Sequence, residues 1–304
     1  MAVAHQIAAT PPPAPAWLDE LALQPGPPWL SMGVRTLELE EWLISDGRFD
    51  EELALKELLL ATRPHEVFAA LAGCEEASDE ILELIQAWRA AHPQEGHAAS
   101  PRADLHPLDA AGRLVQEDLC VMVESDGRYR LEAASLCFPS HWRLHDKLGH
   151  SLATIHDPVP HYAEELAAKV DTFFDRLRAD RPVQRRNLSI HNHDELFRPG
   201  PHESPGSFAP DPSGVDQVWL RSERQTLVRL ARTGAVLFTI KTQQCPVVAL
   251  AGRPDIAAAL AVKLRAEQDD LLRAGRTVPF PLWLVGWLEM CRGEPERERE
   301  RARA

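Results

Sequence analysis

Residues 119–138 read LCVMVESDGRYRLEAASLCF, in which two apolar runs flank a Ser125-Asp126-Gly127 turn. An Asp-Gly pair between apolar runs is a strong short-range signal for a β-hairpin, because both residues tolerate the positive φ that a tight turn requires. We therefore expect a strand at Leu119–Val123, a tight turn, and a second strand at Tyr129–Phe138.

Three further strand candidates follow, at Arg186–His191, Gln217–Leu230 and Ala235–Cys245. Pro199–Gly214, between the first two, is rich in Pro, Gly and Ser and predicts a long loop. Two strands, then helices, then three strands is the order of an antiparallel sheet with helices on one face. The sequence therefore predicts an α+β fold, with further helical segments at the N- and C-terminal ends.

Apolar residues recur at helical spacing on both sides of the predicted sheet and between its strands. We expect helices within Leu37–Leu60, Ser78–Trp88, Tyr162–Leu177, Ile256–Leu272 and 279–290.

Composition divides the chain into five parts. Residues 1–30 are rich in proline and predict an extended arm. The next parts are a helical N-terminal region with a linker at 31–105 and the sheet-bearing core at 106–252. C-terminal helices at 253–293 precede a charged, disordered tail at 294–304.

Charge and cysteine content limit what the chain can bind and where it resides. With 33 Lys and Arg against 46 Asp and Glu, the net charge is −13, which disfavours nucleic acid and anionic membranes as partners. No apolar run predicts a membrane span, and Met1–Trp17 lacks the pattern of a secretory signal. The five cysteines are dispersed without a C-x-x-C pair, which favours a reducing compartment. We expect a cytoplasmic protein.

Histidines concentrate in the central part of the chain, where eight of the thirteen lie between His141 and His202. None of them forms an H-E-x-x-H motif or pairs with cysteines at zinc-finger spacing. His156 stands apart, because Ile155-His156-Asp157-Pro158-Val159-Pro160 holds it between an apolar residue and two rigid prolines. A histidine fixed in this way suits either one bond to a cofactor or a structural role.

The predicted strand at Gln217–Leu230 has no plainly apolar side. Strand alternation places Arg221, Glu223 and Gln225 on one face and Ser222, Arg224 and Thr226 on the other. Such a pattern is typical of a functional site or of an edge strand with internal ion pairs. The chain also lacks a dinucleotide-binding G-x-G-x-x-G, a phosphate-binding P-loop and a G-x-S-x-G elbow.

Three long motifs occur together in this sequence. They are Leu136–Trp142 continuing through Lys147-Leu148-Gly149 to Ile155–Pro160, Arg185-Arg186-Asn187 with Leu196-Phe197, and Trp219–Leu227 leading to Thr233–Ile240. With Met32-Gly33, Trp42-Leu43 and Lys56, they resemble the haem-dependent oxidative N-demethylases over residues 29–290. The sequence departs from the family pattern at Leu188 and His161, which bears on the substrate more than on the haem.

The resemblance implies a PAS-like sheet that holds haem b and oxidises small methylamines such as dimethylamine with O₂. It implies that His156 ligates the iron, and that electrons from NADPH arrive through a partner flavin or ferredoxin-type protein. Glu223 is then the candidate carboxylate for the cationic amine, and Arg224 is assigned with it to catalysis. The expected haem-binding residues are His156, Phe138, Trp142, Val159, Tyr162, Arg221, Gln225 and Arg229.

Two other functions remain open at this stage. A PAS-like fold with a histidine-bound haem could report gas or redox state to a partner without turnover. An interaction module without haem is the third reading, but it leaves the polar strand at 221–226 without a role.

Overall fold

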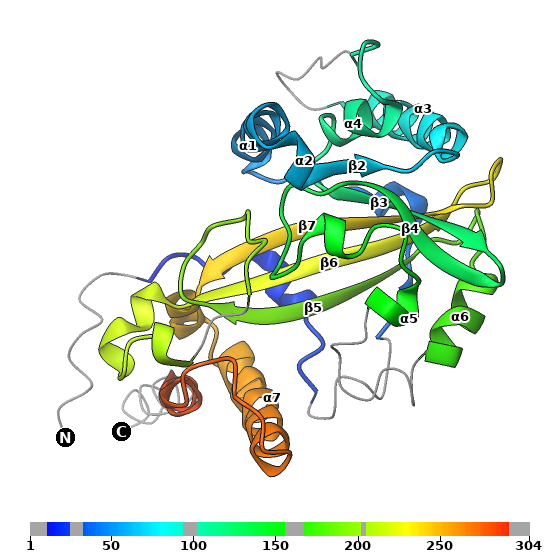
Figure 1. The fold of residues 1–304 in the computed structure, drawn as a ribbon. Helices are drawn as coiled ribbons and strands as arrows, with labels where there is room; N and C mark the ends of the chain where they lie inside the picture. Colours follow the sequence, from blue (N-terminus) through cyan, green and yellow to red (C-terminus); the bar gives the residue numbers. More distant parts are fainter. Residues whose placement is uncertain (1–10, 25–32, 94–101, 156–166, 202–204, 292–304) are drawn as a thin grey trace.

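The computed structural model describes residues 11–24, 33–93, 102–155, 167–201 and 205–291. Within them, one open seven-stranded sheet forms, and each pair of neighbouring strands is antiparallel (Figure 1). In spatial order the strands are β1 (Arg35–Thr36), β5 (Val183–His191), β6 (Trp219–Arg229), β7 (Val236–Pro246), β3 (Asp118–Ser125), β4 (Arg128–Ser135) and β2 (Phe68–Ala70).

The hairpin expected at 119–138 is confirmed as β3 and β4. Ser125 pairs with Arg128, and the two residues between them, Asp126 and Gly127, have φ of 53° and 74°. Positive φ at both central residues gives the turn whose twist matches that of paired strands. The three later strands are confirmed as β5, β6 and β7.

Two edge strands were not predicted. β1 has two residues and β2 has three, which is too short for an alternating pattern to show in the sequence. They extend the sheet on either side of the five predicted strands.

The helices lie close to the expected places. The described helices are α1 (Phe49–Thr62), α2 (Pro64–Val67), α3 (Glu75–Ala91), α4 (Pro107–Gly112), α5 (Leu152–Ile155), α6 (Ala167–Asp175), α7 (Pro254–Arg273) and a last one at 283–291. Of the helix expected at Tyr162–Leu177, the part before 167 lies outside the described residues. So do the predicted tail at 294–304 and parts of the arm and linker.

Helices cover both faces of the sheet, so the expectation of helices on one face is wrong (Figure 1). Glu223 and Leu227 point to what we call the Glu223 face, which packs against α5 and α6. Arg224 and Val228 point to the Arg224 face, which packs against α3 and α4. Because both faces are covered, β6 is buried along most of its length. It is a central strand, so the edge-strand interpretation is also wrong.

The described part of the proline-rich arm is anchored to the body. Trp17 and Leu18, in a short 3₁₀ helix at Ala16–Glu20, are buried in the cluster that contains α7. Glu20 forms ion pairs with Arg35 and Arg186, which tie this helix to β1 and β5. Among the described residues, no helix is both long and apolar enough to cross a lipid bilayer.

Candidate functional site

Polar side chains gather at the centre of the Glu223 face, on three adjacent strands. Strand register aligns Asn187, Glu223 and Thr242 in one row and Ser189, Arg221 and Gln244 in the next. Arg185 and Gln225 form a third row with Ile240. We call Arg185, Asn187, Ser189, Arg221, Glu223, Gln225, Thr242 and Gln244 the polar platform.

Glu223 is held in a fixed orientation on the platform. Its Oε2 accepts hydrogen bonds from Asn187 Nδ2 and Gln225 Nε2, each at 3.0 Å. Its main-chain N–H donates to Asn187 Oδ1 at 2.9 Å. The residue is 8% exposed. A buried carboxylate held by two amides stays in one place, which is what recognition of a small cation requires.

Arg221 links Glu223 to the loops that border the platform. Its guanidinium is fully buried and donates to the main-chain carbonyls of Phe138 at 2.6 Å and Leu196 at 3.1 Å. Its Nε lies 3.8 Å from Glu223 Oε1. Arg221 therefore balances the charge of Glu223 while it fixes two loop segments.

Some buried polar groups on the platform have no hydrogen-bond partner among the residues that the structure describes. Arg185 Nε and both side-chain polar atoms of Gln244 make no hydrogen bond within the described part of the chain. Burial lowers the pKa of the Arg185 guanidinium below its ordinary value, and the charge of Glu223 opposes this effect. Buried polar atoms normally have partners, so these atoms are available to a polar group from outside the described residues.

The structure brings only some of the predicted site residues together. Arg221, Glu223 and Gln225 belong to the platform, and Trp142 packs in the apolar cluster beside it. The ring of Phe138 packs elsewhere, with Leu59 and Leu196, although its carbonyl binds Arg221. His156, Val159 and Tyr162 lie outside the described residues.

Arg224 and Arg229 are separated from Glu223. Arg224 points to the opposite face, where it donates to the carbonyls of Trp42 at 2.9 Å and Glu41 at 2.6 Å. It cannot touch the same small substrate as Glu223.

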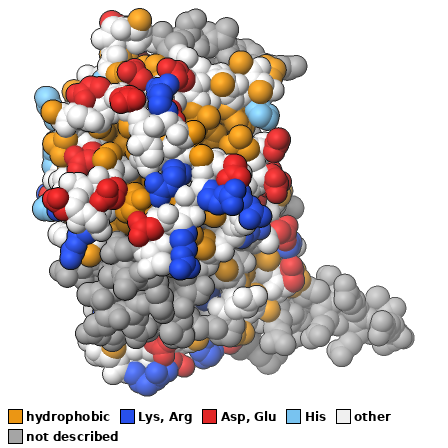
Figure 2. Space-filling model, turned by 90° about the vertical axis from the view of Figure 1, so that its right-hand side faces the viewer, with side chains coloured by type: hydrophobic (Ala, Val, Ile, Leu, Met, Phe, Trp, Pro, Cys, Tyr) orange, Lys and Arg blue, Asp and Glu red, His pale blue; other side chains and the backbone are white. Residues whose placement is uncertain are grey.

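Arg229 is six residues beyond Glu223 on β6. At the usual rise per residue in a strand, this places it about 20 Å away. Its guanidinium donates to the carbonyls of Phe174, Leu177 and Gly234 and to the Tyr129 hydroxyl. It borders an open depression at the end of the sheet, near the hairpin turn. Figure 2 looks onto this side of the molecule, where Lys and Arg side chains lie across the middle with Asp and Glu side chains around them.

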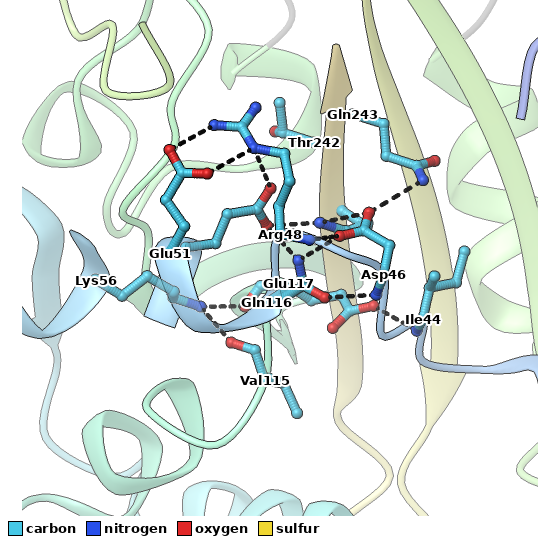
Figure 3. Close-up of polar contacts among 12 residues, drawn as sticks. Ile44, Asp46, Arg48, Glu51, Lys56, Val115, Gln116, Glu117, Thr242 and Gln243 are labelled. Carbon is cyan, nitrogen blue, oxygen red and sulfur yellow. Dashed lines mark hydrogen bonds and ion pairs between the residues drawn. The ribbon is translucent and has the colours of Figure 1, made fainter. Parts of the chain in front are cut away.

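The sequence did not predict a buried ion network on the Arg224 face (Figure 3). Lys241 on β7 lies 2.5 Å from Glu52 on α1 and 3.2 Å from Asp46. Gln116 donates to both carboxylates, at 2.7 Å to Glu52 and 2.8 Å to Asp46. Burial alone would raise the pKa of Asp46, but Lys241 and Gln116 lower it below its ordinary value. The network joins the N-terminal helical layer to the sheet.

A second buried cation, Lys56, connects α1 to the platform. Its Nζ donates to the carbonyls of Val115 and Glu117 and lies 3.8 Å from Asp118 Oδ1. The two carboxylate oxygens of Asp118 accept from the N–H groups of Cys137 and Phe138, each at 2.8 Å. The Phe138 carbonyl accepts a hydrogen bond from Arg221. Asp118 therefore supports the platform indirectly, by holding the backbone at Phe138.

Asp118 gives a pH test of this support. Burial raises its pKa from 3.8 to about 6, against the attraction of Lys56. Between pH 4 and 6 the folded protein thus binds more protons at this group than the unfolded chain, so its contribution to stability falls as pH rises. Relative to Asp118→Asn, wild-type protein should lose about 3 kcal/mol of unfolding free energy across that window. Urea unfolding of both proteins at pH 4, 5, 6 and 7 measures the difference, and a difference that does not change with pH contradicts the assignment.

The model of the haem-dependent oxidative N-demethylase, alpha subunit-like family matches residues 33–274. This chain belongs to that family. The match spans most of the chain and includes the whole seven-stranded sheet, so the family relationship applies to the platform as well. The resemblance inferred from the sequence motifs is confirmed, and the protein is related to haem-dependent oxidoreductases.

The Glu223 face has the chemistry that the family's haem would require. Haem combines a broad apolar ring with anionic propionates. Leu227, Ile240 and Trp142 are apolar neighbours of the platform, and Arg185 provides a half-buried cation whose Nε has no hydrogen-bond partner in the described chain. Arginine is the side chain best suited to a carboxylate. The residues present on this face fit the group.

Proposed function

We propose that this protein is a haem-dependent monooxygenase that removes a methyl group from a small secondary or tertiary methylamine. For dimethylammonium, one O₂, two protons and two electrons give methylammonium, formaldehyde and one water. The observation that carries the proposal is the polar platform, in a chain of this family. It sets one oriented carboxylate, Glu223, beside buried polar atoms that have no hydrogen-bond partner among the described residues.

Haem b would be held over the Glu223 face, with Arg185 binding a propionate and His156 ligating the iron. Ile155, the residue before His156, lies in α5 and packs in the apolar cluster of this face. Lys147 Nζ donates to the Ile155 carbonyl at 2.7 Å and fixes the backbone at this residue. The first and last strands of the five-stranded core, β3 and β7, are neighbours, which supports a PAS-like sheet. When bound, the haem supplies the activation of O₂.

Glu223 holds the substrate ammonium in this proposal. A methylammonium ion is small and carries one charge, so a single carboxylate in a water-poor site binds it and points its methyl groups away from the carboxylate. Asn187 and Gln225 keep Glu223 oriented while the substrate binds and leaves. Arg221 offsets the negative charge when the site is empty of amine.

Electrons would come from NADPH through a partner flavin or ferredoxin-type component. The sequence has no nucleotide-binding glycine motif and no cysteine cluster for an iron–sulfur centre. The family's description as alpha subunit-like supports a partner subunit. We propose a cytoplasmic location, because five dispersed cysteines without a C-x-x-C pair favour a reducing compartment.

Purified protein should show the Soret absorption of haem, and it should release formaldehyde from dimethylamine when a surrogate reductase supplies electrons. His156→Ala should lose most of the haem or shift its absorption bands, while His150→Ala should change neither. Haem without formaldehyde release would favour a sensor, and protein without any haem would contradict both functions. Full haem occupancy with an unchanged spectrum in His156→Ala would contradict the ligand assignment.

A further inference from the structure

Two histidines continue the platform toward the protein surface. His191 lies two residues beyond Ser189 on β5, points to the same face and is 2% exposed. Its Nε2 lies 2.8 Å from Ser189 Oγ, and its Nδ1 lies 3.4 Å from His141 Nε2. The two imidazole rings are parallel within 4°, with centroids 5.1 Å apart. His141 is partly exposed, so the row runs from the surface to the platform.

The backbone of the loop fixes how His141 takes part. His141 has φ of 61°, in the left-handed region that glycine, asparagine, aspartate and histidine adopt more readily than other residues. Its main-chain N–H donates to the Arg198 carbonyl at 2.7 Å. Its Nδ1 lies 2.9 Å from the Pro201 carbonyl. Because a carbonyl only accepts hydrogen bonds, Nδ1 carries the proton and Nε2 faces His191 with its lone pair.

These contacts allow two orientations of the hydrogen-bonded row. When both rings are neutral, the Ser189 hydroxyl donates to His191 Nε2, and His191 Nδ1–H donates to His141 Nε2. When His141 gains a proton at Nε2 and His191 changes from its Nδ1–H to its Nε2–H tautomer, the direction reverses. His141 then donates to His191, and His191 Nε2–H donates to Ser189. The Ser189 hydroxyl then donates inward, toward the Arg221 carbonyl that lies 3.4 Å away.

We propose that His141, His191 and Ser189 form a proton relay that supplies the polar platform from solvent. This inference rests on the proposed function, whose reaction consumes two protons per turnover at a buried site. In each transfer, the Nε2–H bond of His141 breaks as His191 Nδ1 gains the proton, and His191 Nε2–H passes its proton to Ser189 Oγ. The original Ser189 hydroxyl proton passes to the O₂ that is reduced at the platform, which takes up two protons per turnover in the proposed reaction. One proton moves and no electron does.

The relay has a signature that does not depend on turnover. ¹⁵N NMR of histidine side chains at alkaline pH should show Nδ1–H tautomers for both His141 and His191. His141→Asn removes the imidazole and keeps a residue that tolerates positive φ, and in this variant the His191 signals should move. Ser189→Ala should move them as well, while His150→Asn, at an exposed histidine of the β4–α5 connection, should leave them in place. The relay is overturned if His191 is the Nε2–H tautomer and its ¹⁵N signals are the same in wild type and in His141→Asn.

Turnover supplies the second measurement. With the holoenzyme, His141→Asn and Ser189→Ala should lower the rate of formaldehyde release about 10²-fold, the usual contribution of positioned proton transfer. The remaining turnover should show a larger solvent deuterium isotope effect, and the dissociation constant for dimethylamine should not change. His150→Asn should behave as wild type.

These experiments distinguish failure of the proposed function from failure of the relay. Wild-type holoenzyme that releases no formaldehyde overturns the proposed function and, with it, the task of the relay. Wild-type turnover together with unchanged rates in His141→Asn and Ser189→Ala overturns the relay alone. A weaker affinity for dimethylamine as the sole defect of the variants also overturns it, because that result assigns these residues to substrate binding.

Discussion

Lys241→Met should lower the free energy of unfolding by about 3–5 kcal/mol, the usual result of removing one partner from a buried ion pair. Lys241 is fully buried, and Glu52, its closest partner at 2.5 Å, is 2% exposed. Without Lys241, the Glu52 carboxylate keeps Gln116 as a hydrogen-bond donor but loses its nearest counter-charge. Water cannot replace that charge in a site closed by α1 and the sheet. Urea unfolding followed by tryptophan fluorescence measures the change.

Two further variants separate the buried charge from loss of a side chain. Arg265→Met breaks an ion pair between two exposed side chains, Arg265 at 54% and Glu289 at 48%. This substitution should lower the free energy of unfolding by less than about 1 kcal/mol. Lys241→Met combined with Glu52→Gln removes both charges and should recover much of the lost stability. Equal losses in the single and double variants would show that packing, and not charge, is responsible.

The sequence predicted the sheet well because its main signals are local. The Asp126-Gly127 turn and the apolar runs on both sides define β3 and β4 without any distant contact. The alternation of residues along β6 likewise predicted that Glu223 and Arg224 point to opposite faces of the sheet. What could not be predicted is the pairing of β3 with β7, since nothing within either strand specifies a partner so far along the chain.

The sequence could not predict the buried ion network around Lys241. Glu52 and Lys56 lie four residues apart on α1, a spacing that normally indicates an exposed ion pair, because charged side chains are almost never fully buried. Their actual partners include Lys241, which is 189 residues from Glu52. The contact between His141 and His191 could not be predicted for the same reason. The two residues are 50 positions apart and meet only when the loop folds onto β5.

Glu223→Gln should reduce formaldehyde release from dimethylamine by about 10²–10³-fold, the range observed when a group that stabilises charge at a reacting centre is lost. The substitution keeps the size of the side chain and one carbonyl oxygen, which can still accept from Asn187 and Gln225. It removes the negative charge that attracts the ammonium and leaves Arg221 without its nearby carboxylate at 3.8 Å. Both changes make the site less favourable for a cation, so the substrate dissociation constant should rise. Formaldehyde assays over a range of dimethylamine concentrations measure kcat and KM separately.

The haem content and spectrum of Glu223→Gln should match wild type, because the propionate partner in the proposal is Arg185. Glu132→Gln is the matched control, since Glu132 is a half-buried glutamate on β4 of the same sheet, and it should keep wild-type turnover. Arg185→Met should give the opposite result to Glu223→Gln, with reduced haem affinity and normal turnover per haem that remains bound. If Glu223→Gln keeps its activity while Arg185→Met loses it per bound haem, the roles are exchanged, and the substrate lies at the Arg185 side of the platform as a group that an arginine can bind.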